Sequence, residues 1–123
     1  MNKLGIYVHI PFCRQKCYYC DFISYANNEE KIEEYINALK KEIKEESKNI
    51  NKDEYVISTI YLGGGTPSYI HKKYISEIIC EIQENYNVEK EAEITIEVNP
   101  GTVNKEKLRE YKQIGINRLS IGL

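Results

Sequence analysis

The chain has 123 residues, of which 41% are hydrophobic and 29% are charged, and its formal net charge is −2. This size suits one domain or part of one, and the composition is typical of a soluble globular protein. The near-neutral charge gives no overall attraction to nucleic acid or to a membrane surface. No apolar run reaches the roughly 20 residues that span a bilayer, and no signal-peptide core follows Met1, so we expect a cytoplasmic protein.

Strand and helix patterns alternate along the chain. Four segments have the alternating or β-branched pattern of strands, over residues 4–10, 55–62, 92–98 and 116–123. Apolar residues at helical spacing predict three helices between them: one over about residues 28–47, one marked by Ile70 to Tyr86, and one capped by Thr102 or Asn104 and ended by Gly115. This order predicts parallel strands joined by right-handed crossovers.

Three of the four predicted strands keep polar or small side chains on one face. The candidates for this face are Tyr7, His9, Glu93, Thr95, Glu97, Arg118 and Ser120. Strands covered by helices on both faces are usually apolar on both sides, whereas the interior of a ligand-binding barrel suits a polar face. We therefore predict an α/β fold, a partial (β/α) barrel of four parallel strands with alternating helices. Because four strands cannot close a barrel, we expect residues 1–123 to be the amino-terminal, truncated part of a single domain. The alternative is that the open edge of the sheet pairs with another chain or segment.

Three cysteines, Cys13, Cys17 and Cys20, lie in one short segment directly after the first predicted strand. Three thiols cannot all pair into disulfides, and their close spacing allows one loop to direct them at a single centre, as iron–sulfur ligation requires. One iron of such a cluster stays open to another ligand. A structural zinc site with His9 or Cys80 as fourth ligand is the competing interpretation. A redox-active Cys17–Cys20 pair is the least favoured interpretation, because a third cysteine nearby is not part of that motif.

Two further segments are unusual at the ends of predicted strands. Gly63-Gly64-Gly65-Thr66-Pro67 follows the second strand and removes side chains where a ligand could reach backbone N–H and C=O groups, although the run alone is equally a tight turn. It matches neither the dinucleotide fingerprint nor the P-loop. Glu97 ends the third strand on its polar face, whereas Tyr7 and His9, taken alone, are more often core residues. Since the carboxyl ends of parallel strands share one side of a sheet, the cysteines, the glycines and Glu97 should meet there.

These motifs resemble those of a known family. Four blocks are similar, in the same order, to the radical S-adenosylmethionine (SAM) superfamily, and within it to oxygen-independent coproporphyrinogen oxidases and haem chaperones: residues 7–22, 61–68, 96–102 and 117–122. The resemblance implies that a [4Fe–4S] cluster, with SAM on its fourth iron, is bound by Cys13, Cys17 and Cys20. It implies SAM contacts from Tyr7, Gly64, Gly65, Thr66 and Glu97. Tyr19 matches an aromatic residue that contacts a second SAM in the oxidase branch.

The resemblance also implies a function. In the family, an electron from a flavodoxin- or ferredoxin-type donor passes through the cluster and cleaves SAM to a radical, while the protein binds and orients the reactants. Oxidases typically carry another cysteine two residues after the third one, whereas this chain reads Cys20-Asp21-Phe22, which is typical of the haem chaperones. We therefore expect a protein that binds haem and transfers it to acceptor proteins. Oxidative decarboxylation of a porphyrinogen is the alternative, and a zinc-stabilised binding module is the third.

Overall fold

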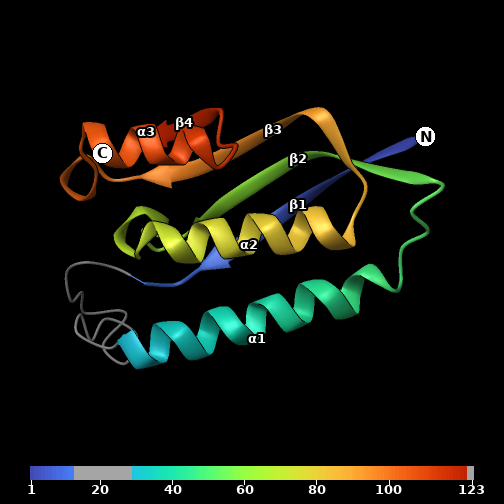
Figure 1. Ribbon diagram of the computed structural model, residues 1–123, viewed down its shortest axis with the longest axis horizontal. Helices are drawn as coiled ribbons and strands as arrows, with labels where there is room; N and C mark the ends of the chain where they lie inside the picture. Colours follow the sequence, from blue (N-terminus) through green and yellow to red (C-terminus); the bar gives the residue numbers. More distant parts are fainter. Residues whose placement is uncertain (13–28, 122–123) are drawn as a thin grey trace.

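The computed structural model describes residues 1–12 and 29–121 of the chain. Its main elements are β1 (Asn2–Ile10), α1 (Glu29–Ser47), β2 (Tyr55–Gly64), α2 (Lys72–Asn85), β3 (Val88–Val98), α3 (Lys105–Gln113) and β4 (Arg118–Ile121). The four strands form one parallel sheet in the order β1-β2-β3-β4 (Figure 1). The predicted alternation of parallel strands and helices is therefore confirmed. Within the described ranges, no helix combines the length and the apolar character that crossing a membrane requires.

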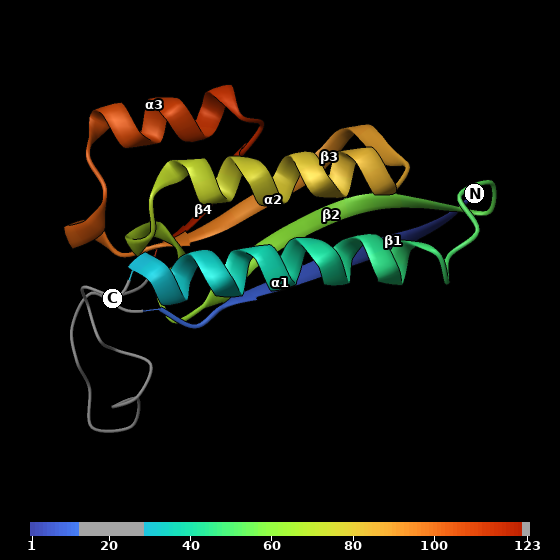
Figure 2. The same cartoon turned by 60° about the horizontal axis from the view of Figure 1, so that its bottom comes forward.

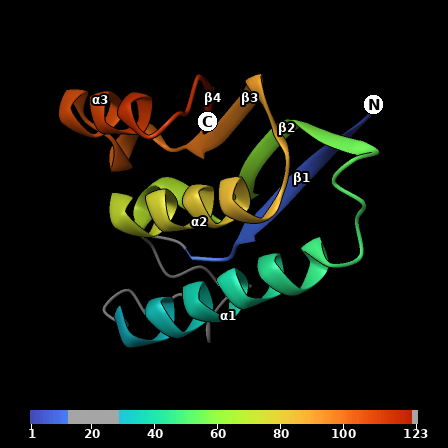
Figure 3. The same ribbon diagram turned by 45° about the vertical axis from the view of Figure 1, so that its right-hand side comes forward.

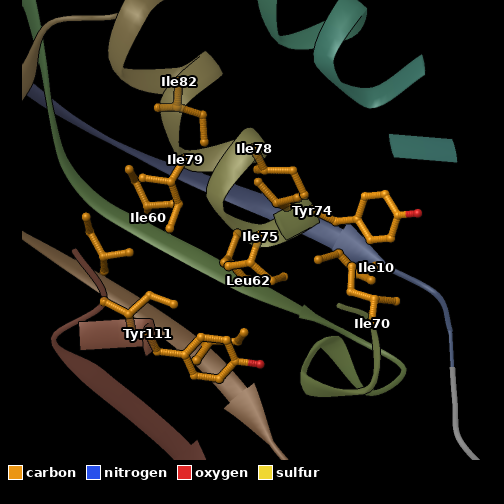
Figure 4. Packing of buried hydrophobic residues seen from close by; sticks show 14 of the residues in the cluster. Ile10, Ile60, Leu62, Ile70, Tyr74, Ile75, Ile78, Ile79, Ile82 and Tyr111 are labelled. Atoms are coloured by element: carbon orange, nitrogen blue, oxygen red, sulfur yellow. The ribbon is translucent and has the colours of Figure 1, made fainter. Parts of the chain in front are cut away.

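All three helices lie on the same face of the sheet, as Figures 1 and 2 show from two directions. Figure 3 shows the same arrangement, with α1, α2 and α3 side by side in one layer. The core lies between this layer and the strands. In Figure 4 the isoleucines of α2, among them Ile75 and Ile79, point toward Leu62 and Ile60 of β2, and all four side chains are buried. Each such burial stabilises the fold by roughly 1.5–3 kcal/mol relative to exposure.

The other face of the sheet carries the predicted polar side chains, and no helix in the described part of the chain covers it. In the register of the strands, Tyr61 lies between Tyr7 and Thr95, and Glu97 lies beside Ser120. Paired residues of parallel strands point to the same face. Thr95 differs from the others because it is buried, with a relative exposure of 2%. A sheet with helices on one face and polar residues on the other resembles a barrel wall more than a doubly covered sheet.

The second helix begins later than the sequence pattern predicted. Pro67 starts a short 3₁₀ turn, η1 (Pro67–Tyr69), and Ile70 follows it in an extended conformation. The helix begins at Lys72 because the side chain of His71 caps it, accepting a hydrogen bond from the Lys73 N–H at 3.0 Å. Ile70 is buried, with a relative exposure of 1%, and it therefore fits the apolar spacing of a helix although it precedes α2.

Other boundaries follow from capping and pairing. Asn104, and not Thr102, caps α3 by accepting from the Lys107 N–H at 2.8 Å. Gly115 ends this helix with a φ of +109°, as predicted. The third strand begins at Val88 rather than Ala92, because Val88 pairs with Ile57 on β2. The fourth strand begins at Arg118 rather than at Ile116, and residues 122–123 of its predicted range lie outside the described residues, as does residue 28 of the first predicted helix.

Asn117 attaches β3 to the segment that leads into β4. Its amide oxygen accepts from the Ile94 N–H and its amide nitrogen donates to the Ala92 carbonyl, both at 2.9 Å. Asn117→Ala leaves these two β3 groups without their partner, and an unpaired buried group costs about 1–3 kcal/mol. We expect the variant to lose about 2–3 kcal/mol of unfolding free energy in urea titration. Asn37→Ala, at an exposed position of α1, should not lower the unfolding free energy, because alanine is favoured over asparagine in a helix by up to about 0.7 kcal/mol; an equal loss in both variants would contradict the prediction.

Candidate functional site

The carboxyl ends of β1, β2 and β3 meet at one edge of the sheet (Figure 2). The Gly65 N–H donates to the Ile10 carbonyl at 2.9 Å, and the Thr66 N–H donates to the Phe12 carbonyl at 2.7 Å. The Gly64 N–H donates to Glu97 Oε1 at 3.0 Å. The glycine turn is therefore hydrogen-bonded to the end of β1 on one side and to β3 on the other.

The described residues thus bring together the glycine turn, Glu97 and Phe12, and of the predicted meeting they confirm the part that concerns the glycines and Glu97. Phe12 is the last described residue before Cys13 in the chain. The positions of Cys13, Cys17, Cys20 and Tyr19 lie outside the described residues, so these four assignments stay predictions.

Packing requires glycine at two positions of the turn. Gly64 has a φ of +121°, and a Cβ there would lie 2.7 Å from the Ile10 carbonyl oxygen. A Cβ on Gly63 would lie 3.0 Å or less from atoms of Tyr61, Glu97 and Tyr7. A side chain at either position would collide with the adjoining strand or with the side chains around the turn. The turn is therefore a tight one, in which Gly64 and Gly65 are exposed.

The polar groups that remain at this turn are mainly acceptors. The N–H groups of Gly64, Gly65 and Thr66 all donate within the protein. The sequence had suggested that both N–H and C=O groups would face a ligand. With the three N–H groups engaged, the Glu97 carboxylate is the group that suits a ligand, because each of its oxygens has more than one lone pair, and it favours a ligand carrying N–H or O–H donors or a positive charge.

Glu97 lies in a small cluster of aromatic residues. Its second oxygen, Oε2, accepts from the Tyr61 hydroxyl at 2.8 Å. The rings of Tyr61 and Tyr7 are stacked, with centroids 5.8 Å apart and an interplanar angle of 19°. The Tyr7 hydroxyl lies 3.2 Å from His9 Nδ1. Tyr7, which is 58% exposed, and His9 both lie on the uncovered face. The expectation from their residue types alone, that they belong to the core, is therefore wrong.

The environment of Tyr7 keeps its hydroxyl protonated. Partial burial, then the carboxylate of Glu97 and then Tyr61 raise the pKa of Tyr7 above its usual value. Like a tyrosine with its usual pKa, Tyr7 is a neutral phenol at physiological pH and can donate or accept a hydrogen bond. Farther along the same face, Arg118 Nε lies 3.3 Å from Glu93 Oε1 in an exposed ion pair, which contributes little to stability.

Contacts from α1 and α2 fix the residues on either side of the cysteine segment. Tyr35 of α1 donates from its hydroxyl to the His9 carbonyl at 2.5 Å, and its ring packs edge-on against Phe12. Glu29, the first residue of α1, accepts from the Tyr74 hydroxyl at 3.0 Å. Burial and this hydrogen bond raise the pKa of Tyr74 to about 12. Phe12 and Glu29, the described residues nearest the cysteines, are thus both held by tertiary contacts.

The alternative zinc site needs His9 or Cys80 as fourth ligand beside the three cysteines, and it stays a prediction because those cysteines lie outside the described residues. Cys80 is exposed on α2, on the helical side of the sheet, whereas the His9 side chain lies on the uncovered face. Across residues 1–12 and 29–121 there is no group of three side chains that could bind a metal ion.

Sequence reasoning missed three residues that organise this edge: Tyr61, Tyr35 and Ser68. The Ser68 hydroxyl accepts from the Asn99 N–H at 3.2 Å and so joins η1 to the end of β3. Tyr61 could have been found from the sequence, because it stands two residues before Gly63 and therefore shares its face of the strand. Tyr35 could not, since its position in the apolar stripe of α1 is typical of any core residue.

Comparison with known proteins agrees with this geometry. The model of the Radical SAM superfamily matches residues 7–123. The chain is 43% identical over 124 residues to the heme chaperone HemW of Buchnera aphidicola from Schizaphis graminum, covering 100% of this chain and 32% of that protein. It is 37% identical over 123 residues to the oxygen-independent coproporphyrinogen III oxidase of Salmonella typhimurium, covering 99% of this chain and 26% of that protein.

A solved structure is also similar. It is that of coproporphyrinogen III oxidase (HemN) from Escherichia coli, described as a radical SAM enzyme, with a TM-score of 0.87 and 34% identity over 99% of this chain and 28% of that one. The chain thus spans about a third or less of the length of these relatives. With a family model that matches nearly all of it and a closely similar solved fold, the chain belongs to the radical SAM superfamily.

Proposed function

We propose that the protein is a haem chaperone that carries a [4Fe–4S] cluster and SAM, binds haem and transfers it to acceptor proteins. The observation that carries the proposal is the pair of hydrogen bonds from Gly65 and Thr66 to the end of β1. They join the glycine turn to the strand that leads into the three cysteines, so one site could contain both the thiolates and the acceptors of the turn.

The described residues are compatible with SAM as the ligand of the turn. SAM is positively charged at its sulfonium and ammonium groups, and the acceptors at the turn suit such a ligand. The residues proposed to contact it are Tyr7, Gly64, Gly65, Thr66 and Glu97, with the cluster on Cys13, Cys17 and Cys20. When both are bound, the cluster and SAM supply the one-electron chemistry of the family, with electrons from a flavodoxin- or ferredoxin-type donor.

The protein's own residues then have separate tasks. Tyr7, a neutral phenol whose pKa its surroundings raise further, offers a hydroxyl donor without adding negative charge. Glu97, fixed through both oxygens, offers a carboxylate in one orientation. The absence of side chains at Gly64 and Gly65 lets a ligand approach the backbone closely.

The choice of the chaperone branch is supported by the residues after Cys20 and by the 43% identity to a heme chaperone. The coproporphyrinogen oxidase is the second candidate, and the solved structure with a TM-score of 0.87 favours it. The two candidates share the proposed cluster and SAM site, and they differ in the fate of the porphyrin.

The test uses the full-length protein, reconstituted anaerobically with iron and sulfide. It is incubated with reductant, SAM and coproporphyrinogen in one reaction, and with haem and a haem-free acceptor protein in another. We expect haem binding and transfer to the acceptor, without formation of protoporphyrinogen. Protoporphyrinogen formation over many turnovers would overturn the chaperone assignment in favour of the oxidase.

A further inference from the structure

Tyr61 connects the two halves of the site without being one of the residues proposed to contact SAM. It lies on β2, and its hydroxyl donates to Oε2 of Glu97 on β3 at 2.8 Å. Its ring stacks on Tyr7 of β1 at 5.8 Å. A single side chain of the middle strand therefore contacts two of the proposed SAM-contacting residues, one on each neighbouring strand.

The Tyr61 hydrogen bond completes a two-point attachment of the Glu97 carboxylate. Oε1 accepts from the Gly64 N–H at 3.0 Å, and Oε2 accepts from the Tyr61 hydroxyl. A carboxylate held at one oxygen can still turn about its terminal torsion, which has a broad energy profile. A second donor on the other oxygen removes that freedom, so the remaining lone pairs of Glu97 keep one direction.

Gly63 makes this arrangement possible. It lies in register with His9, and a Cβ at Gly63 would lie 2.9 Å from a ring carbon of Tyr61 and 3.0 Å from Glu97 Oε1. Because Gly63 has no side chain, the Tyr61 ring and the Glu97 carboxylate can both lie against the backbone at this position. Gly63 is consequently buried although it lies on the uncovered face.

We propose that Tyr61 is a positioning residue that fixes the Glu97 carboxylate in the orientation needed to bind SAM. This inference rests on the proposed function, because it needs Glu97 to contact SAM. Tyr61 acts through Glu97 and not on the ligand itself. Its hydroxyl should therefore matter only while the carboxylate is present.

The test is a double-mutant cycle on SAM affinity in the full-length, cluster-loaded protein. The variants are Tyr61→Phe, which keeps the ring that stacks on Tyr7, Glu97→Ala, and the two combined. Tyr55→Phe, at the other end of the same strand, is the matched control. Iron content and melting temperature are measured for every variant, so that a loss of fold or cluster is separated from a loss of binding.

We expect Tyr61→Phe to raise the SAM dissociation constant about 10-fold, because a hydrogen bond to a charged group is lost. Iron content should equal that of the unsubstituted protein, and Tyr55→Phe should bind SAM normally. Glu97→Ala should weaken binding by about 10-fold or more, and adding Tyr61→Phe to it should cause no further loss.

The possible results distinguish a failure of the role of Tyr61 from a failure of the proposed SAM contact of Glu97. If Glu97→Ala weakens SAM binding but Tyr61→Phe does not, or if their effects multiply, Tyr61 does not act through Glu97 and the inference is overturned while the proposed SAM contact stands. If Glu97→Ala binds SAM normally, the contact itself is overturned and the inference with it.

Discussion

Replacing Cys17 with serine will leave the protein without its iron–sulfur cluster. The proposed cluster has only three protein ligands, and a serine hydroxyl does not replace a thiolate as an iron ligand. Loss of a residue that merely supports a metal ligand costs about 10–100-fold in affinity, so loss of a ligand should cost more. The check is iron and sulfide content and visible absorption after anaerobic reconstitution. The substitution changes none of the described core residues, so the variant should remain folded.

Cys80→Ser is the control for this experiment. Cys80 is exposed on α2, on the helical side of the sheet, and should have no part in the cluster. The variant should take up as much iron as the unsubstituted protein. Equal losses of iron in Cys17→Ser and Cys80→Ser would show that the ligand assignment is wrong. A colourless protein containing one zinc ion would show that the site is structural.

Gly64→Ala will destabilise the protein and weaken SAM binding together. The φ of +121° is unfavourable for any residue with a side chain, at a cost of about 1–3 kcal/mol. The new methyl group would also lie 2.7 Å from the Ile10 carbonyl oxygen and 2.8 Å from the Ile10 nitrogen. Both are backbone atoms of a paired strand, so the turn has to move instead. This movement strains its hydrogen bonds to Ile10 and Glu97.

We expect Gly64→Ala to lose about 3 kcal/mol or more of unfolding free energy, measured by urea titration, since the steric cost adds to the conformational one. The SAM dissociation constant should rise by about 10-fold or more, because Glu97 loses a backbone donor.

Gly115→Ala is the control that distinguishes the cost of a positive φ from the effect of a substitution at the glycine turn. Gly115 has a similar φ of +109°, but the nearest atom to a Cβ there is Ile94 Cδ1 at 3.7 Å, an ordinary contact. This variant should lose only about 1–2 kcal/mol of unfolding free energy and should bind SAM normally. If Gly64→Ala binds SAM as well as Gly115→Ala does, the glycine turn does not contribute to the ligand site.

Local patterns in the sequence determined the order of the elements and the polar face of the sheet. Alternation with a period of two along a strand decides which side chains share a face, and this holds wherever the strand pairs. The alternating pattern therefore places Glu97 and Arg118 on the correct face of the sheet. The meeting of the glycine turn with the end of β1 was predictable in the same way, because parallel strands end on one side of a sheet.

Only the tertiary structure decided how the site residues contact one another. The bond from Tyr61 to Glu97 joins residues 36 positions apart, and the bond from Tyr35 to the His9 carbonyl joins residues 26 apart. No periodicity within one segment carries information about such pairs. Which residues form such pairs depends on strand register and on the position of α1 against the sheet. The sequence pattern also places Ile70 in the second helix, because an apolar pattern indicates only that a residue is buried. The backbone conformation of a buried residue depends on its neighbours, and Ile70 is extended because it follows η1.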